Sequence, residues 1–342
     1  KNYMIFSSFN FLIFFIIYFL IWRFISPKYK LSVLIFGSLI FYGHWNYFYV
    51  FLPILLTLLG FTFANWITKA KTTTEKKRNL FASIFVILIP LIFFKYTNFL
   101  LGKEVIQTSL PLGISFITFT LIAYLVDVSK NEYKQEKDFK WLLSYIIYFP
   151  QLIAGPILRP KQLIPQLKEN FSKKNLSIML GTLLFTLGLF KKIIIADGIA
   201  PAVEKVYLYP NSIDFFQWII GVYGFSIQIY CDFSGYTDMA LGIALILGIN
   251  LPQNFNKPYL ATSLREFWRC WHITLSNWFR DYVYIPIGGN KVSKTRLMFN
   301  TMFTMTLCGL WHGAGFNFII WGFMHGLIIG FSNILKLDLI FF

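Results

Sequence analysis

The chain has 342 residues, of which 56% are hydrophobic and only 13% are charged, against roughly 25% charged in an ordinary soluble domain. So few charges cannot cover a soluble protein of this length, and the same composition excludes disordered and disulfide-stapled chains. A polytopic membrane protein remains. The net charge of +16 is expected for a membrane protein, because such proteins carry an excess of Lys and Arg in their cytoplasmic loops. Since no basic helix stands outside the apolar segments, we expect no nucleic-acid partner.

Apolar stretches recur along the chain, and because they are continuous rather than alternating they predict transmembrane helices and not a barrel. They lie at about Phe9–Ile25, Leu31–Tyr42, Tyr47–Ile67, Leu80–Leu100, Leu110–Val128, Leu176–Ile195, Ile213–Cys231, Met298–Trp311 and Phe316–Leu335. The first is expected to be a retained span, since no small-residue cleavage site follows it. The cysteines Cys231, Cys270 and Cys308 show no pairing pattern and are expected to be free thiols.

The charges of the loops indicate orientation. The links after the first, third and fifth stretches are rich in Lys and Arg, whereas Gly43–Asn46 has neither and the link around residues 102–108 has only Lys103. Basic loops stay in the cytoplasm, so the N-terminus is expected outside. His44, in the link without basic residues, is expected to be an interface residue rather than a catalyst.

The apolar segment Trp141–Pro160 breaks this alternation, because basic residues flank it on both sides and Pro150, Gly155 and Pro156 interrupt it. A segment that leaves and returns to the same side, with helix breakers in the middle, is typical of a re-entrant segment. Non-helical backbone at membrane depth is tolerated where it lines an internal cavity, so the segment predicts such a cavity.

A polar stripe follows the segment Ser263–Asp281, which is predicted to be a single amphipathic helix that begins with a Ser263–Glu266 capping box. The polar face carries Arg265, Arg269, His272, Ser276 and Arg280. Either an interfacial helix with arginines at lipid phosphates or the wall of a functional cavity would explain this stripe. The residues alone leave both open.

A second polar face lies on the predicted helix that ends at His312, with Thr301, Thr304 and Cys308 on the same side. An ionisable residue at the end of a span is a candidate functional residue, although a histidine can also simply bond a neighbouring helix. Cys308 is more simply a small buried hydrophobe than the partner of His312. Gly313 and Gly315 are expected to let backbones pack closely.

Two carboxylates, Asp232 and Asp238, flank Gly235 between apolar runs, and a turn is predicted there. Helix capping and salt bridges to the stripe arginines are favoured for them over cation binding. Asn254 lies in the loop that leads into the stripe.

Together these residues resemble the membrane-bound O-acyltransferase family, in particular its bacterial branch of alginate and peptidoglycan O-acetyltransferases. The motifs that carry the resemblance are Phe149–Ile157, Asp232–Ala240, Asn254–Tyr259, Glu266–Ser276, Trp278–Gly289, Gly309–Gly315 and Trp321–Gly326. The opening Met4–Ser8 also resembles the start of the family, so the resemblance covers essentially the whole chain. Residues 1–342 are therefore expected to form one integral-membrane domain in a bacterial inner membrane, truncated at its C-terminus. Cys270 stands where the family usually has an arginine.

The resemblance implies an all-α ring of tilted transmembrane and re-entrant helices around a central tunnel. It also implies that His312 is the essential residue and that His272 is the second catalytic histidine. The supporting candidates for the tunnel or the donor site are Arg265, Arg269, Ser276, Arg280, Glu266, Asp232, Asp238, Asn254 and Cys308. No metal and no bound cofactor are expected. Acetyl-CoA or another acyl thioester would be the donor substrate.

The predicted function is transfer of an acetyl group from a cytosolic thioester to hydroxyls of an extracytoplasmic polysaccharide, with peptidoglycan as first choice and an alginate-like polymer second. A neutral imidazole near the hydroxyl would accept its proton during attack on the thioester. The expected partners are membrane lipids, the polysaccharide and a periplasmic acetyltransferase- or esterase-like protein. The alternatives are D-alanyl transfer to teichoic acid and a transporter or flippase that uses the histidines as a proton relay.

Overall fold

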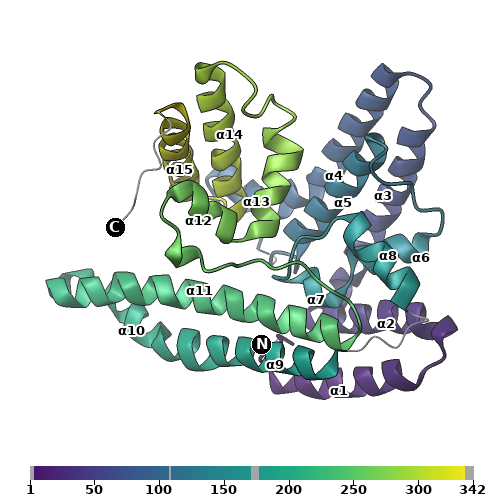
Figure 1. Cartoon of the computed structure of the whole chain (residues 1–342), viewed down its shortest axis with the longest axis horizontal. Coiled ribbons are helices and arrows are strands. Elements are labelled where there is room, and N and C mark those ends of the chain that lie inside the picture. Colours follow the sequence, from purple (N-terminus) through teal and green to yellow (C-terminus); the bar gives the residue numbers. More distant parts are fainter. Residues whose placement is uncertain (1–3, 108, 171–176, 336–342) are drawn as a thin grey trace. The chain divides into compact units, whose positions relative to one another are not determined.

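The computed structural model describes residues 4–107, 109–170 and 177–335, and every regular element in them is helical (Figure 1). The predicted helical fold class is therefore confirmed. The chain divides into two compact units. The first comprises Lys1–Phe48, Ile147–Pro156 and Gln162–Pro252, and the second comprises Tyr49–Ile146, Ile157–Lys161 and Gln253–Phe342.

The first unit combines longer helices with short helical segments. Its elements are α1 (Phe9–Phe24), α2 (Pro27–Trp45), α7 (Phe149–Leu152), most of α8 (Pro160–Asn170), α9 (Ile178–Phe190), the π-helical η2 (Lys191–Ala196), α10 (Asp197–Leu208), η3 (Pro210–Ser212) and α11 (Phe215–Ile246). Phe6, Phe11 and Phe149 are buried in its aromatic core. The helix α9 runs against α11, where a Cβ on Gly188 would come within 2.4 Å of the carbonyl oxygen of Gly235. Gly235 therefore lies at a close helix contact, and the predicted turn at this position is wrong.

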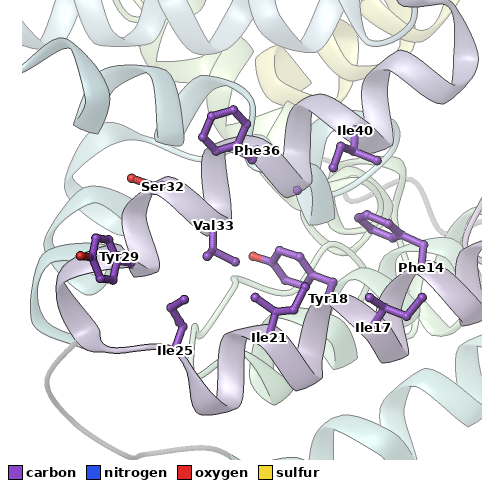
Figure 2. Close-up of a pocket in the computed structure, with 11 residues that line it drawn as sticks. Phe14, Ile17, Tyr18, Ile21, Ile25, Tyr29, Ser32, Val33, Phe36 and Ile40 are labelled. Atoms are coloured by element: carbon purple, nitrogen blue, oxygen red, sulfur yellow. The ribbon is translucent and has the colours of Figure 1, made fainter.

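Helices α1 and α2 of the first unit enclose an apolar groove of about 400 Å³ (Figure 2). Gly37 of α2 leaves room for the ring of Tyr18, since an added Cβ would lie 2.3 Å from its Cε2 atom. The helix α2 continues through His44 to Trp45, so the link predicted at Gly43–Asn46 is shorter than expected. His44 is exposed, as an interface residue should be.

The second unit contains the elements that carry both predicted catalytic histidines. They are η1 (Tyr47–Val50), α3 (Phe51–Thr68), α4 (Thr73–Leu101), α5 (Ile114–Ser129), α6 (Phe139–Ile146), η4 (Pro258–Leu260), α12 (Leu264–Cys270), α13 (Ile273–Phe279), the π-helical η5 (Arg280–Tyr284), α14 (Lys294–His312) and α15 (Phe316–Leu335). Almost every residue of α5 is buried, and this helix packs against α3 and α4. The helices α14 and α15 meet where a Cβ on Gly322 would lie 2.3 Å from the carbonyl oxygen of Met305.

Four helical segments of the described residues are long and apolar enough to cross a membrane: Tyr47–Thr68, Thr73–Leu101, Ile178–Leu208 and Phe316–Leu335. Two further predicted spans form the shorter apolar helices Phe9–Phe24 and Ile114–Ser129. The helix α4 starts before its apolar stretch because the Thr72 hydroxyl caps it, accepting from the Glu75 N–H at 3.1 Å. These elements identify the chain as a membrane protein.

The predicted interruption of Trp141–Pro160 is confirmed. Two short helices, α6 and α7, occupy its first part, and no helix follows until α8 begins at Pro160. Pro150 lies within the first turn of α7, where a proline is tolerated because its missing N–H has no helical partner. That this segment enters and leaves the same side of the membrane stays a prediction, as do the single domain and the tunnel.

Candidate active site

The polar stripe is broken in the middle, and the prediction of one helix over Ser263–Asp281 is wrong. The helix α12 ends at Cys270, and α13 begins at Ile273. Between them His272 adopts φ 42° and ψ 53°, a left-handed conformation that is uncommon outside glycine. The predicted start is confirmed in part: the Ser263 hydroxyl accepts from the N–H of Glu266 at 3.2 Å.

The break is held by Asn254, which lies in the loop before the stripe. The Asn254 Oδ1 atom accepts from the Thr274 N–H at 3.1 Å and from the Thr274 hydroxyl at 2.7 Å. The Asn254 carbonyl accepts from the N–H of Ile273 at 2.9 Å. These donors belong to the first turn of α13, where a helix leaves its N–H groups without internal partners. The buried Asn254 therefore fixes the first turn of α13, directly after His272.

His272 itself is 1% exposed, and its ring lies edge-on to Trp311 with the centroids 6.1 Å apart. Burial, reinforced by the neighbouring His312, lowers the pKa of His272 from 6.5 to about 3. The imidazole is thus neutral at physiological pH, so it can donate one hydrogen bond and accept another.

His312 is the last residue of α14, and its imidazole is exposed. It lies between two indoles, with ring centroids 5.0 Å from Trp311 and 5.4 Å from Trp321. Trp311 is thus a ring neighbour of both predicted histidines. The structure brings together His272 and His312, which are 40 positions apart in the sequence.

His325 extends this group of rings on α15. Its centroid is 4.7 Å from that of Trp321, and its Nδ1 atom accepts from the indole N–H of Trp268 at 3.4 Å. Packing, the simplest explanation for His325, is consistent with these contacts. Trp278 on α13 is fixed to α5, because its indole N–H donates to the carbonyl of Phe119 at 3.0 Å. The ring of Phe119 in turn lies 5.5 Å from that of Trp311.

A cavity of about 380 Å³ lies beside these rings, between the stripe and helices α14 and α15. Both predicted polar faces line it, through Arg265, Arg269, Ser276 and Arg280 on one side and Thr301, Thr304 and Cys308 on the other. His272 and His312 are not among its lining side chains. The arginine face of the stripe therefore borders a cavity, as the cavity-wall alternative predicts.

The stripe arginines differ in their contacts. Arg265 donates to the Oδ1 atom of Asn333 on α15, and the Arg280 Nε atom lies 2.7 Å from a carboxylate oxygen of Asp281. Arg269 is exposed. Glu266 has a local role, because its carboxylate accepts from the N–H and the hydroxyl of Thr262, each at 2.8 Å. It stabilises the start of α12 and is not among the residues that line the cavity.

Asp232 and Asp238 do not lie in a turn but inside α11, in the first unit. Asp238 pairs with Lys191 at 2.6 Å, and Asp232 pairs with Lys192 at 2.8 Å. Both lysines belong to the π-helical η2, so the predicted capping role and the predicted arginine partners are wrong. The local sequence did not reveal these lysines, since they stand at the end of another apolar stretch.

All three cysteines are free thiols, as predicted. Cys308 is buried in the wall of the cavity, which agrees with a packing role. Within the described residues, no group of three or more His, Cys, Asp or Glu side chains is arranged to hold a metal ion.

Lys95 and Tyr96, in the last part of α4, were not predicted to lie near the histidines. The Lys95 ammonium donates to the carbonyl of Trp311, and the Tyr96 hydroxyl donates to the carbonyl of Leu310 at 2.8 Å. The sequence did contain a signal for Lys95, which is the single lysine within the apolar stretch Leu80–Leu100. A charge inside a membrane span is rare and is therefore a candidate functional residue.

Comparison with known proteins places the chain in a family. The sequence profile of MBOAT, the membrane-bound O-acyltransferase family, matches residues 37–337. The chain is 36% identical to the probable alginate O-acetylase AlgI of Azotobacter vinelandii, over 98% of this chain and 70% of the relative. It is 37% identical to the peptidoglycan O-acetyltransferase of Helicobacter pylori, over 89% of this chain and 64% of the relative.

A more distant relative is the teichoic acid D-alanyltransferase of Bacillus subtilis, 30% identical over 65% of this chain and 58% of the relative. The chain thus spans between about half and three quarters of the length of these relatives. The family match covers both histidines and the whole cavity wall. The chain belongs to the membrane-bound O-acyltransferase family.

Proposed function

We propose that this protein transfers an acetyl group from a cytosolic thioester, acetyl-CoA, across the inner membrane to hydroxyls of an extracytoplasmic polysaccharide. One observation carries the proposal: two histidines from distant segments meet around Trp311, beside a cavity with three arginines in its wall. Acyl transfer needs a base at a hydroxyl and a site for a charged donor, and this arrangement offers both.

His312 is the proposed general base. Its neutral imidazole accepts the proton of the sugar hydroxyl while the oxygen attacks the thioester carbon. A C–O bond forms, the C–S bond breaks, and the thiolate leaves and takes up the proton. General base catalysis of this kind contributes about 10²–10⁴-fold. The exposed imidazole of His312 suits this role, because a base must reach the substrate.

His272 is proposed to assist from its buried position. A neutral imidazole can donate a hydrogen bond to the oxyanion that develops on the thioester carbonyl, and its fixed backbone means that little reorganisation is needed. Asn254 supports this role by fixing the turn that carries His272. Loss of His272 is therefore expected to leave residual transfer, whereas loss of His312 is not.

The cavity is proposed as part of the path of the donor. Arg265, Arg269 and Arg280 place three guanidinium groups around it, and guanidinium groups bind phosphates in bidentate geometry. Coenzyme A carries such phosphates. Arg269→Gln is expected to raise the KM for acetyl-CoA about fivefold or more with little change in kcat, because it removes binding energy shared by ground state and transition state.

Peptidoglycan is the first choice of acceptor and an alginate-like polymer the second, in keeping with the names of the relatives. D-alanyl transfer to teichoic acid is the second candidate function, favoured by the Bacillus subtilis relative. We further propose that the N-terminus faces outside, that lipids surround the protein, and that a separate periplasmic acetyltransferase- or esterase-like protein receives the acyl group.

The test uses the full-length protein in sealed membrane vesicles with acetyl-labelled acetyl-CoA, peptidoglycan and a periplasmic extract. Labelled ester on the polymer is expected from the wild type and from His44→Ala, and none from His312→Ala or His312→Gln at equal protein levels. An amide cannot act as a base near neutral pH, so glutamine does not restore transfer.

Parallel samples replace the polymer by alginate, replace the donor by a D-alanyl thioester, or omit the extract. Full transfer by His312→Ala would remove the assigned base. Exclusive use of the D-alanyl thioester would favour the second function. Transport of an unmodified substrate without ester formation would refute the acyltransferase proposal, and full rate without the extract would refute the partner.

A further inference from the structure

The side chain of Lys95 reaches from α4 to the end of α14. Its ammonium group donates to the carbonyl of Trp311 and lies 5.6 Å from the centroid of the Trp311 ring. The lysine is half-buried and belongs to one of the four candidate membrane spans. A charge in such a segment is energetically expensive, so its presence calls for a specific partner.

The partner is the C-terminal end of the helix that carries His312. The last four carbonyl groups of a helix accept no hydrogen bond from the N–H groups of the same helix. A positive charge near them also interacts favourably with the helix dipole. Tyr96 satisfies the carbonyl of Leu310, and Lys95 satisfies that of Trp311. Helix α4 therefore donates hydrogen bonds to the carbonyl groups of Leu310 and Trp311, the two residues immediately before His312.

A carboxylate partner does not account for Lys95, because the ion pairs found among the described residues do not include it. A neutral donor such as the neighbouring tyrosine would satisfy a carbonyl group at lower cost in a membrane. The charge itself is thus the feature to be explained. It lies against the ring and the backbone of the residue that contacts both histidines.

We infer that Lys95 is a positioning residue of the active site, which fixes the Trp311–His312 turn through its charge and so orients the imidazole of His312 toward the reacting hydroxyl. The inference rests on the proposed function for its catalytic consequence. The orientation itself is a property of the chain and is measurable without substrate. A misplacement of about 1 Å in a reacting group reduces the rate by about 10²-fold.

The experiment compares Lys95→Met, Lys95→Arg and Tyr96→Phe in full-length protein in vesicles. Tyr96→Phe is the matched control, because it removes the adjacent carbonyl hydrogen bond without changing charge. For Lys95→Met we expect a fall in kcat of about tenfold or more, with KM for acetyl-CoA within about twofold. Lys95→Arg is expected to keep at least about a third of wild-type kcat, and Tyr96→Phe more than about half.

A second readout does not need acyl transfer. Diethylpyrocarbonate modifies neutral imidazole, and the rate at His312 is followed by mass spectrometry at pH 7. We expect faster modification in Lys95→Met, by about threefold or more, and wild-type rates in the arginine and Tyr96→Phe variants. Should Lys95→Met fail to fold, Lys95→Gln takes its place in both measurements, because it also removes the charge while keeping a polar side chain.

Wild-type kcat in Lys95→Met, or equal losses in Lys95→Met and Tyr96→Phe, would overturn the inference. No recovery by arginine would also overturn it. If the wild type transfers no acyl group while the modification rates follow the expected order, the proposed function fails and the positioning role of Lys95 stands.

Discussion

The buried His272 should make the protein less stable in mild acid. The pKa of this residue is lowered from 6.5 to about 3, because burial and the nearby His312 disfavour the charged ring. Between about pH 3 and pH 6.5 the imidazole of His272 is protonated in the unfolded chain but not in the folded chain. The free energy of unfolding therefore falls as the pH drops below about 6.5 and stops falling near pH 3.

The size of the effect follows from the same values. At pH 5 the solution is about 1.5 units below the ordinary pKa, and each unit is worth about 1.4 kcal/mol, so about 2 kcal/mol of stability is lost between pH 8 and pH 5. The variant for comparison is His272→Asn, because asparagine tolerates the left-handed backbone and does not titrate. His44→Gln, at an exposed site, is the control.

The measurement is chemical unfolding in mixed detergent micelles at pH 8, 6.5 and 5. The wild type and His44→Gln should lose about 2 kcal/mol more than His272→Asn between pH 8 and pH 5. Equal losses in the wild type and His272→Asn would show that the folded protein accommodates the imidazolium. The account of His272 as a neutral ring would then be refuted.

Two more predictions concern stability, and both are measured by unfolding at pH 8. Trp278→Phe should cost about 1 kcal/mol more than Trp311→Phe, because the indole N–H of Trp278 makes a hydrogen bond while that of Trp311 is buried without a partner among the described residues; a smaller loss in Trp278→Phe would contradict this. Gly322→Ala should cost about 1–3 kcal/mol, since its Cβ would collide with the carbonyl of Met305. Gly198→Ala, with nothing within 4 Å, should be neutral or stabilising by up to about 1 kcal/mol, and equal losses at the two glycines would refute the close contact.

Much of the candidate site was predictable from local patterns. The facing polar sides of the stripe and of α14 are properties of helical periodicity, and the cavity lined by Arg265, Arg269, Thr304 and Cys308 confirms that they belong together. The choice of His272 and His312 rested on the cost of ionisable groups in apolar segments and on the family motifs. Both histidines contact Trp311, although their catalytic roles stay predictions.

The errors share a cause. The single stripe helix, the turn at Gly235 and the arginine partners of the two aspartates were all inferred from neighbours in the sequence. In each case a contact with a residue far away in the chain determines the structure instead. Asn254 takes the first donors of α13, and Lys191 and Lys192 pair with carboxylates of α11. Local propensity is weak, and a hydrogen bond or ion pair to a distant residue can outweigh it.

Composition and periodicity alone were sufficient to identify a helical membrane protein and to locate its apolar helices, because burial in lipid constrains residue type directly. The left-handed backbone at His272, the ion pairs of α11 and the contact of Lys95 with Trp311 depended on tertiary structure. Each joins segments that are separated in the chain, and no local pattern encodes which distant donor satisfies a given carbonyl or carboxylate.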